Sequence, residues 1–318
     1  MLADRLTLPA DVLAVHVEAV LAGRPAEQIA AGARIEPGDL ADAVEAYRAA
    51  GLAALHARQD KAWFNARVQV ADWADAESAF ATVIGPLLDQ LPGSPGWWYL
   101  RKYPCWRIRI RTDRHQEVRA VLDDLVDQHV VAAWTPGVYE PEDVAFGGPA
   151  GTAAVHGLFC ADSANVLAYS RLDPPPIGRR ELSLILIRTL QDHAGLDPFE
   201  AGDVFARLAR SRPAPVGEQR QQIDDLATRM LPLLTLDPQY RAQLFAPAGA
   251  LHVAAAWRGA FETAGRQLGE AATAGHLDRG LRAILAQLVI FHWNRLHLTA
   301  AAQGVLARAA TAALLPPG

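Results

Sequence analysis

Residues 106–112 read Trp-Arg-Ile-Arg-Ile-Arg-Thr, an alternation that is typical of a β-strand. Successive side chains of a strand point to opposite faces, so Arg107, Arg109 and Arg111 share one face and the apolar residues share the other. Neighbouring arginines on that face lie roughly 7 Å apart and repel one another. Because a guanidinium group only donates hydrogen bonds, this face must meet carboxylates, an anionic ligand or water.

The composition of the chain makes this arginine cluster a local feature. The 318 residues carry a formal net charge of −5, and an acidic balance argues against general nucleic-acid binding. Hydrophobic residues make up 51% of the chain, which is enough for a substantial core in one or two domains. We therefore expect no DNA partner.

Cysteine usage and hydropathy indicate the compartment. Cys105 and Cys160 are the whole cysteine content, with no Cys-x-x-Cys motif and no neighbouring His/Cys set. The sequence therefore predicts no disulfide framework and no metal site. No apolar run approaches the length of a membrane span, and the first residues lack the pattern of a secretion signal. We expect a cytoplasmic protein without a membrane contact.

The hydrophobic period changes near residue 60. Residues 1–60 carry apolar side chains at helical spacing and are predicted to form a short helical lead-in. After them, strands are predicted at 62–70, 97–101, 105–112 and 130–139, and helices at 75–91 and 114–129. This order is typical of the split βαβ, or ferredoxin-like, arrangement, an antiparallel sheet with two helices on one face. The arginines are then expected on the open face of that sheet.

The rest of the chain has mostly helical patterning. Helices are predicted around 150–171, 178–195, 217–235, 249–273 and 276–297, with proline-rich breaks at 173–176 and 212–215. We therefore expect an α+β protein in two parts. The parts are the helical lead-in at 1–60 and an α+β domain with a large helical half at 61–318.

Two further stretches concentrate polar groups. Residues 139–143 read Tyr-Glu-Pro-Glu-Asp. This acidic stretch has three interpretations: it holds the arginines in place, it presents a carboxylate as a base, or it forms an acidic surface loop. His292, Asn294 and Arg295 lie in a strongly apolar predicted helix, so at least one of them must enter the interior or a cleft. From the residues alone, His292 is either a hydrogen-bonded core histidine or an acid–base group.

Four motifs follow one another along the chain: Trp-Trp-Tyr-Leu-Arg leading to Pro-Cys-Trp-Arg-Ile-Arg at 97–109, Tyr-Glu-Pro-Glu followed by Phe-Gly-Gly-Pro at 139–149, Leu-Phe followed by Ala-Asp-Ser at 158–163, and His-Trp-Asn-Arg at 292–295. In this order they resemble the motifs of the lantibiotic dehydratase C-terminal, or thiopeptide-type bacteriocin biosynthesis, domain family. The ordered series spans most of the chain, from about residue 60 to about residue 315.

The resemblance implies action on a leader-bearing, ribosomally made precursor peptide. Some members eliminate glutamate from glutamylated Ser or Thr and leave dehydroalanine or dehydrobutyrine. Others are thiopeptide pyridine synthases, which join two dehydroalanines in a formal [4+2] cycloaddition and expel the leader peptide. Neither chemistry needs a metal or redox cofactor. A non-catalytic homologue that binds the leader peptide is the third interpretation.

The same resemblance assigns the candidate site. Arg107 and Arg109 match the family's catalytic arginine pair, His292 its catalytic histidine, and Glu142 a glutamate of the same pocket. Further substrate contacts are expected from Arg111, Tyr139, Asn294 and Arg295. Elimination needs a base for the α-proton and fixed cations for the charge that develops on the neighbouring amide oxygen. A guanidinium group also fits the carboxylates of a departing glutamate.

One position departs from the pattern of the eliminating members. Ala145 stands where they carry an arginine, in an Arg-Tyr-Gly-Gly sequence that here reads Ala-Phe-Gly-Gly. Either Arg111 or Arg295 takes the place of that arginine, or the protein catalyses another reaction. Pyridine synthases also depart from the elimination residues, so both chemistries stay open.

The expected partners follow from the length of the chain and from the resemblance. The chain lacks the larger region that glutamylates the peptide, so we expect a separate glutamylating dehydratase subunit to supply the substrate. The leader peptide is expected either to add a strand to the exposed edge of the sheet or to lie in a groove between helices. Related enzymes often pair, which leaves a homodimer open.

Overall fold

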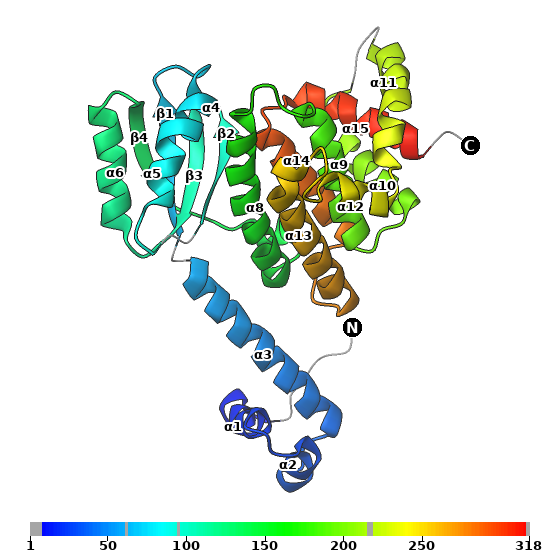
Figure 1. Cartoon of the computed structure of the whole chain (residues 1–318). Coiled ribbons are helices and arrows are strands. Elements are labelled where there is room, and N and C mark those ends of the chain that lie inside the picture. The colour runs from blue at the N-terminus through cyan, green and yellow to red at the C-terminus, as the bar shows by residue number, and fades with distance from the viewer. Residues whose placement is uncertain (1–7, 61–62, 94–95, 215–218, 316–318) are drawn as a thin grey trace. The chain divides into compact units, whose positions relative to one another are not determined.

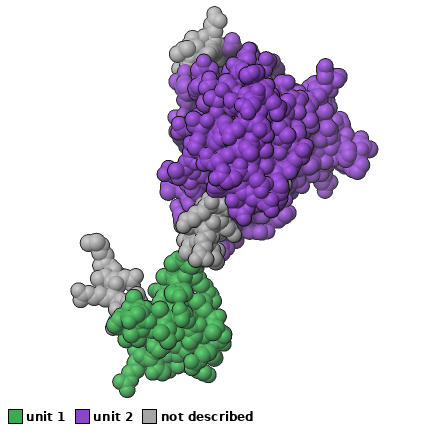
Figure 2. Space-filling model, turned by 90° about the vertical axis from the view of Figure 1, so that its left-hand side faces the viewer, with its two compact units in different colours: residues 1–61 green, residues 62–318 purple. Residues whose placement is uncertain are grey.

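The computed structural model describes residues 8–60, 63–93, 96–214 and 219–315. The chain divides into two units, residues 1–61 and residues 62–318 (Figure 2). The described part of the first unit consists of helices α1 (Ala10–Leu21), α2 (Ala26–Ala33) and α3 (Pro37–Asp60). Leu13, Val17, Ile29 and Leu40 pack together as its small core.

The second unit begins with a sheet and its covering helices (Figure 1). The elements are β1 (Trp63–Val70), α4 (Ala76–Ala79), η1 (Phe80–Ile84), α5 (Gly85–Asp89), β2 (Trp97–Lys102), β3 (Cys105–Arg111), α6 (His115–Asp127) and β4 (Val131–Gly137). The strands lie in the order β2-β3-β1-β4, and each neighbouring pair is antiparallel. The predicted strands and helices of this region match the observed ones to within one or two residues, except that Ala62 lies outside the described residues.

Helices make up most of the described remainder. They are α7 (Asp143–Phe146), α8 (Pro149–Ser170), α9 (Arg179–His193), α10 (Pro198–Arg210), α11 (Gln219–Leu234), α12 (Pro238–Leu244), η2 (His252–Ala254), α13 (Ala255–Thr273), α14 (Leu281–Arg295) and α15 (Ala300–Leu314). The chain is therefore α+β with a large helical half. The first two residues of the predicted helix at 217–235 lie outside the described residues. None of the described helices is both long and apolar enough to span a membrane.

The apolar face of β3 packs where the alternation predicts. Trp106, Ile108 and Ile110 belong to a core that also holds side chains of η1, α5 and α6. Phe80 stacks on Trp106, with the two ring centroids 4.1 Å apart. The two helical segments therefore cover this face of the sheet.

The arginine face of the sheet is not open along its whole width, contrary to our expectation. Trp98 and Trp63 lie opposite Arg109 and Arg111 in the neighbouring strands, and both tryptophans are buried in a second core shared with the helical half. Helices α8 and α14 pack on β2, and Figure 1 shows α8 beside that strand. Farther along the same face, Arg67 of β1 and Thr135 of β4 are exposed. The arginines therefore lie at the margin between a covered half and an exposed half.

The outer edge of β2 is hydrogen-bonded to side chains of the helical half. The hydroxyl of Ser163 in α8 accepts a hydrogen bond from the backbone N–H of Tyr99 at 3.2 Å. The amide of Asn294 in α14 accepts from the N–H of Arg101 at 2.9 Å and donates to its carbonyl at 3.1 Å. A peptide therefore cannot add a strand here without displacing these side chains, whereas β4 forms the opposite edge.

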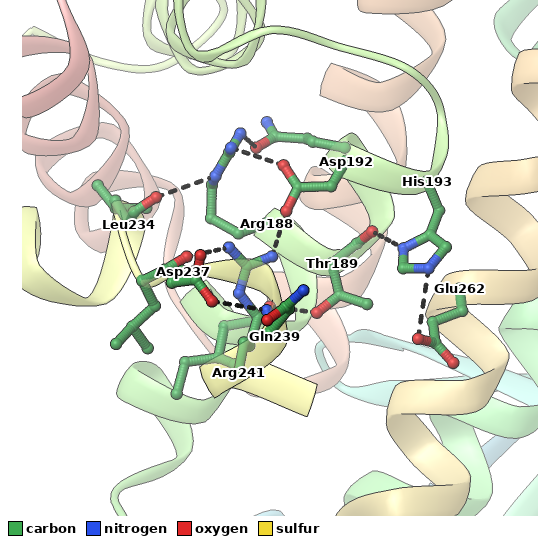
Figure 3. Close-up of polar contacts among 12 residues, drawn as sticks. Arg188, Thr189, Asp192, His193, Leu234, Asp237, Gln239, Arg241 and Glu262 are labelled. Atoms are coloured by element: carbon green, nitrogen blue, oxygen red, sulfur yellow. Dashed lines mark hydrogen bonds and ion pairs between the residues drawn. The ribbon is translucent and has the colours of Figure 1, made fainter. Parts of the chain in front are cut away.

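A buried ion-pair cluster fastens α9 to the segment around α12 (Figure 3). Asp192 of α9 pairs with Arg188 at 2.7 Å and with Arg241 of α12. Arg188 also donates to the carbonyl of Leu234 at 3.0 Å, and Arg241 donates to the carbonyl of Leu236 at 2.7 Å. Two buried guanidinium groups therefore share one carboxylate.

We expect Asp192→Asn to lower the free energy of unfolding by about 3 kcal/mol, because it leaves two buried guanidinium groups without their charged partner. Urea unfolding followed by circular dichroism measures the loss. Asp203→Asn is the matched control, since Asp203 pairs with the half-exposed side chains of Arg207 and Arg282. Pairs of that kind contribute roughly 0–1 kcal/mol. Equal losses in the two variants would contradict the structural role of this cluster.

Candidate functional site

Arg109 of β3 is a buried cation held against aromatic rings. It is 8% exposed, and its Cζ lies 4.4 Å from the ring centroid of Trp98 and 5.8 Å from that of Tyr139. Cation–π contacts of this kind are attractive. Burial lowers the pKa of Arg109 to about 10; Tyr139 and Glu142 act against this, whereas Arg107 adds to it. Arg109 therefore remains charged at neutral pH.

The arginine face has cations without paired anions. Within the described ranges, no carboxylate forms an ion pair with Arg107, Arg109, Arg111 or Arg67. The buried Nε of Arg109 has no hydrogen-bond partner there, and its NH1 group makes one long bond, of 3.3 Å, to the carbonyl of Arg107. Arg67 of β1 lies directly opposite Arg107. Since like charges in opposite positions destabilise a sheet, an anion bound here would be stabilising.

His156 of α8 belongs to this patch, although the sequence analysis does not single it out. Its Nε2 lies 2.5 Å from the Tyr139 hydroxyl oxygen, and its ring centroid is 4.9 Å from that of Trp63. Burial, together with Arg111 and Arg109, lowers the pKa of His156 to about 4, while Asp143 acts in the opposite direction. His156 is therefore a neutral imidazole beside two arginines at neutral pH.

His292 lies in the interior, away from the exposed part of the arginine face. It is 3% exposed. Its Nδ1 is 2.9 Å from a carboxylate oxygen of Asp162, and its Nε2 is 2.9 Å from the hydroxyl oxygen of Ser183. The Ser183 oxygen also accepts from the indole N–H of Trp293 at 2.9 Å. Both ring nitrogens of His292 are thus engaged by interior groups.

Asp162 of α8 is the centre of this interior network. It accepts hydrogen bonds from the indole of Trp257 at 2.8 Å and from Arg295 at 3.0 Å, in addition to its contact with His292. Burial alone would raise the pKa of Asp162, but His292 and Arg295 outweigh it and hold that pKa below its usual value. An adjoining cavity of about 10 Å³ has room for about one water molecule.

Arg295 links the interior network to the arginine face. Its Cζ lies 4.3 Å from the ring centroid of Phe159 and 5.6 Å from that of Trp98, the ring on which Arg109 also lies. A continuous series of contacts therefore runs from His292 through Asp162, Arg295 and Trp98 to Arg109. The structure brings Arg295 and Arg109 together at Trp98, whereas His292 contacts this group only through Asp162.

The other predicted site residues take three different positions. Arg107 is half-buried and Arg111 is exposed, both on the arginine face, and Glu142 is exposed at the start of α7. Asn294 uses its amide on the backbone of β2, as described above. The guanidinium group of Arg279 lies near Ala145 and donates to the Ala145 carbonyl at 3.1 Å.

Four contributors to the site were not in the predicted set, and the sequence carries a signal for three of them. Trp98 and Asp162 both stand within the quoted motifs. His156 lies seven residues before Ser163, which places the two on the same side of α8. Arg67 is found only through its register with Arg107. In the described ranges, no group of three or more His, Cys, Asp or Glu side chains is arranged to hold a metal ion.

Comparison with known proteins assigns the chain to a family. The sequence profile of the family described as "Lantibiotic biosynthesis dehydratase C-term" matches residues 63–314. The chain therefore belongs to the lantibiotic dehydratase C-terminal family, as the motifs predicted. No curated protein matches the chain.

Two solved structures share the fold. The tRNA dependent lantibiotic dehydratase MibB from Microbispora sp. 107891 is 19% identical, with a TM-score of 0.53 over 78% of this chain and 28% of MibB. TsrL is 18% identical, with a TM-score of 0.52 over 79% of this chain and 93% of TsrL. The chain thus spans less than a third of MibB and nearly all of TsrL. At these identities the likeness is one of fold.

Proposed function

We propose that this protein eliminates glutamate from glutamylated Ser or Thr residues of a leader-bearing precursor peptide, leaving dehydroalanine or dehydrobutyrine. Membership of the lantibiotic dehydratase C-terminal family supports the substrate class. The observation that carries the proposal is the buried guanidinium group of Arg109, which has no carboxylate partner in the described ranges and lies among other unpaired arginines. A glutamyl carboxylate supplies the anion that this site lacks.

The proposed roles follow from position. Arg109 and Arg107 bind the glutamyl carboxylate and stabilise the charge that develops on the neighbouring amide oxygen. Arg111 and Tyr139 contact the substrate from the same face. The negative charge of Glu142 partly offsets the positive charge around Arg109. The sheet that carries them is, in our proposal, of the split βαβ type, which the order β2-β3-β1-β4 supports.

The interior residues act on this site indirectly. We assign His292 a positioning role: it orients Asp162, which holds Arg295 near Trp98, the ring that Arg109 also contacts. Asn294 positions β2 through its bonds to the Arg101 backbone. Neither side chain touches the substrate in this account, in contrast to the direct roles that the resemblance implies.

The proposed partners are a precursor peptide and a separate glutamylating subunit in the cytoplasm. The likeness of this chain to MibB, a tRNA dependent lantibiotic dehydratase, supports this choice of partners. Pairing of two copies of this chain is part of the same proposal.

A second candidate function is the [4+2] cycloaddition of a thiopeptide pyridine synthase. Ala145 favours it, because the arginine of the eliminating members is missing there. Arg279, whose guanidinium group lies at the Ala145 carbonyl, is the residue placed to compensate if elimination is the reaction. A leader-binding protein without activity is the third possibility.

Intact-mass spectrometry separates these functions. The purified protein is incubated with a glutamylated precursor peptide and, in parallel, with a dehydroalanine-containing, azole-bearing precursor. Elimination predicts loss of glutamate and a dehydrated residue in the first sample. Free leader peptide and a macrocycle in the second sample, with the glutamyl peptide intact, would contradict elimination and establish the cycloaddition. Binding without any change in mass would leave the leader-binding function.

A further inference from the structure

The arginine face needs a group that accepts the α-proton, and His292 is not placed to supply it. Both nitrogens of its ring are engaged by Asp162 and Ser183 in the interior. The cavity beside it, of about 10 Å³, admits about one water molecule and no peptide. A base that touches the substrate must therefore come from another residue of the patch.

Tyr139 and His156 occupy the required position. The Tyr139 ring lies 5.8 Å from the Arg109 Cζ, so its hydroxyl belongs to the same patch as the proposed carboxylate site. That hydroxyl is 2.5 Å from His156 Nε2, a distance within which a proton passes directly between oxygen and nitrogen. The rings of Trp63 and Trp98 flank the His156 imidazole on the side of the sheet, with ring centroids 4.9 and 6.4 Å from that of the imidazole.

We propose that Tyr139 and His156 form the proton-transfer pair of the arginine face, an inference that rests on the proposed elimination of glutamate. With the proton of neutral His156 on Nδ1, the Tyr139 hydroxyl donates to Nε2. The Tyr139 oxygen then takes the α-proton of the glutamylated residue as its own proton passes to Nε2. The electron pair of the broken Cα–H bond forms the Cα=Cβ double bond, the Cβ–O bond breaks, and glutamate leaves as its carboxylate. The imidazolium releases its proton to solvent afterwards.

The charges around His156 make this pair responsive to the substrate. Arg109 and Arg111 of β3 disfavour the imidazolium, Asp143 of α7 favours it, and burial lowers the pKa of His156 to about 4 without a ligand. A carboxylate bound at the arginines offsets their charge and raises the pKa of His156. The pair thus becomes a competent proton acceptor when the anionic substrate is bound.

Two variants test the pair. His156→Gln and Tyr139→Phe are each expected to lower kcat for glutamate elimination about 100-fold, with a smaller change in KM. His115→Gln is the matched control, because His115 packs edge-on against Phe64 on the other side of the sheet, and it should eliminate glutamate at the wild-type rate. If the wild type itself leaves the glutamyl peptide intact, the proposed function fails. If the wild type is active and both variants stay within about twofold of it, the proton-transfer pair is overturned and the proposed function stands.

A titration of the wild-type protein gives a second readout, which does not depend on the activity of either variant. Histidine resonances are followed by NMR against pH, with and without a peptide that carries glutamate in an unreactive amide linkage, and His156→Gln assigns the signal. We expect the pKa of His156 to rise by about one unit or more when the analogue binds. A His156 pKa that does not move with bound analogue would contradict the proposal.

Discussion

Arg109→Lys is expected to lower kcat/KM for glutamate elimination about 100- to 1,000-fold while the protein stays folded. Lysine keeps the positive charge, but it loses the planar fork that binds a carboxylate with two hydrogen bonds. It also loses the flat contact of the guanidinium group with Trp98. Steady-state kinetics with a glutamylated peptide measure the effect, and thermal unfolding checks the fold.

Arg119→Lys is the matched control for this variant. The Arg119 guanidinium group also lies on aromatic rings, 5.5 Å from the Phe64 centroid and 5.6 Å from that of Trp134, but on the other face of the sheet. The same chemical change at this position should leave kcat/KM within about twofold of the wild type, an amount of roughly 0.4 kcal/mol. An equal loss of activity in both variants would mean that Arg109 serves the fold and not the reaction.

Asp162→Asn is expected to have the largest effect on stability, a loss of about 3–5 kcal/mol. The change removes the one carboxylate that pairs with the buried Arg295, whose Nε and NH2 groups have no hydrogen-bond partner in the described residues. Urea unfolding measures the loss. A change below about 1 kcal/mol, the range of exposed ion pairs, would contradict the central position that we give Asp162.

The same residue predicts how stability depends on pH. Because its pKa in the folded protein is held below the usual value, the carboxylate contributes stability above its unfolded pKa, and this contribution is lost as the pH falls below about 4. Unfolding midpoints of the wild type should therefore drop as the pH falls from about 4 to about 2. The drop should be smaller in Asp162→Asn, which lacks the contribution already.

Strict alternation made the sheet predictable from sequence. Trp106, Ile108 and Ile110 can reach one core only from the same face of a strand, and they do so. The coverage of the opposite face could not be predicted, because it depends on where α8 and α14 dock. Both helices are apolar on most sides and carry little periodic signal that would indicate which side meets the sheet.

The same property of α14 explains why the position of His292 could not be predicted. Helix α14 carries almost no periodic signal, so its sequence does not show whether His292 faces the interior or a cleft. Its partner Asp162 is a single acidic residue in the long helix α8, and only the fold shows that it meets His292 and Arg295, which lie 130 and 133 positions away. The role of His156 could not be predicted for a related reason: its partners Tyr139 and Trp63 lie on other elements.

The claim that the arginine face holds the glutamyl group is tested most directly by a crystal structure of the complex. The protein is crystallised with a precursor peptide whose glutamate is attached through an unreactive amide bond. Our account predicts the glutamyl carboxylate within hydrogen-bond distance of the guanidinium groups of Arg107 and Arg109, with the peptide α-carbon beside the Tyr139 hydroxyl. A glutamyl group bound elsewhere, with the arginine face in contact with water alone, would contradict it.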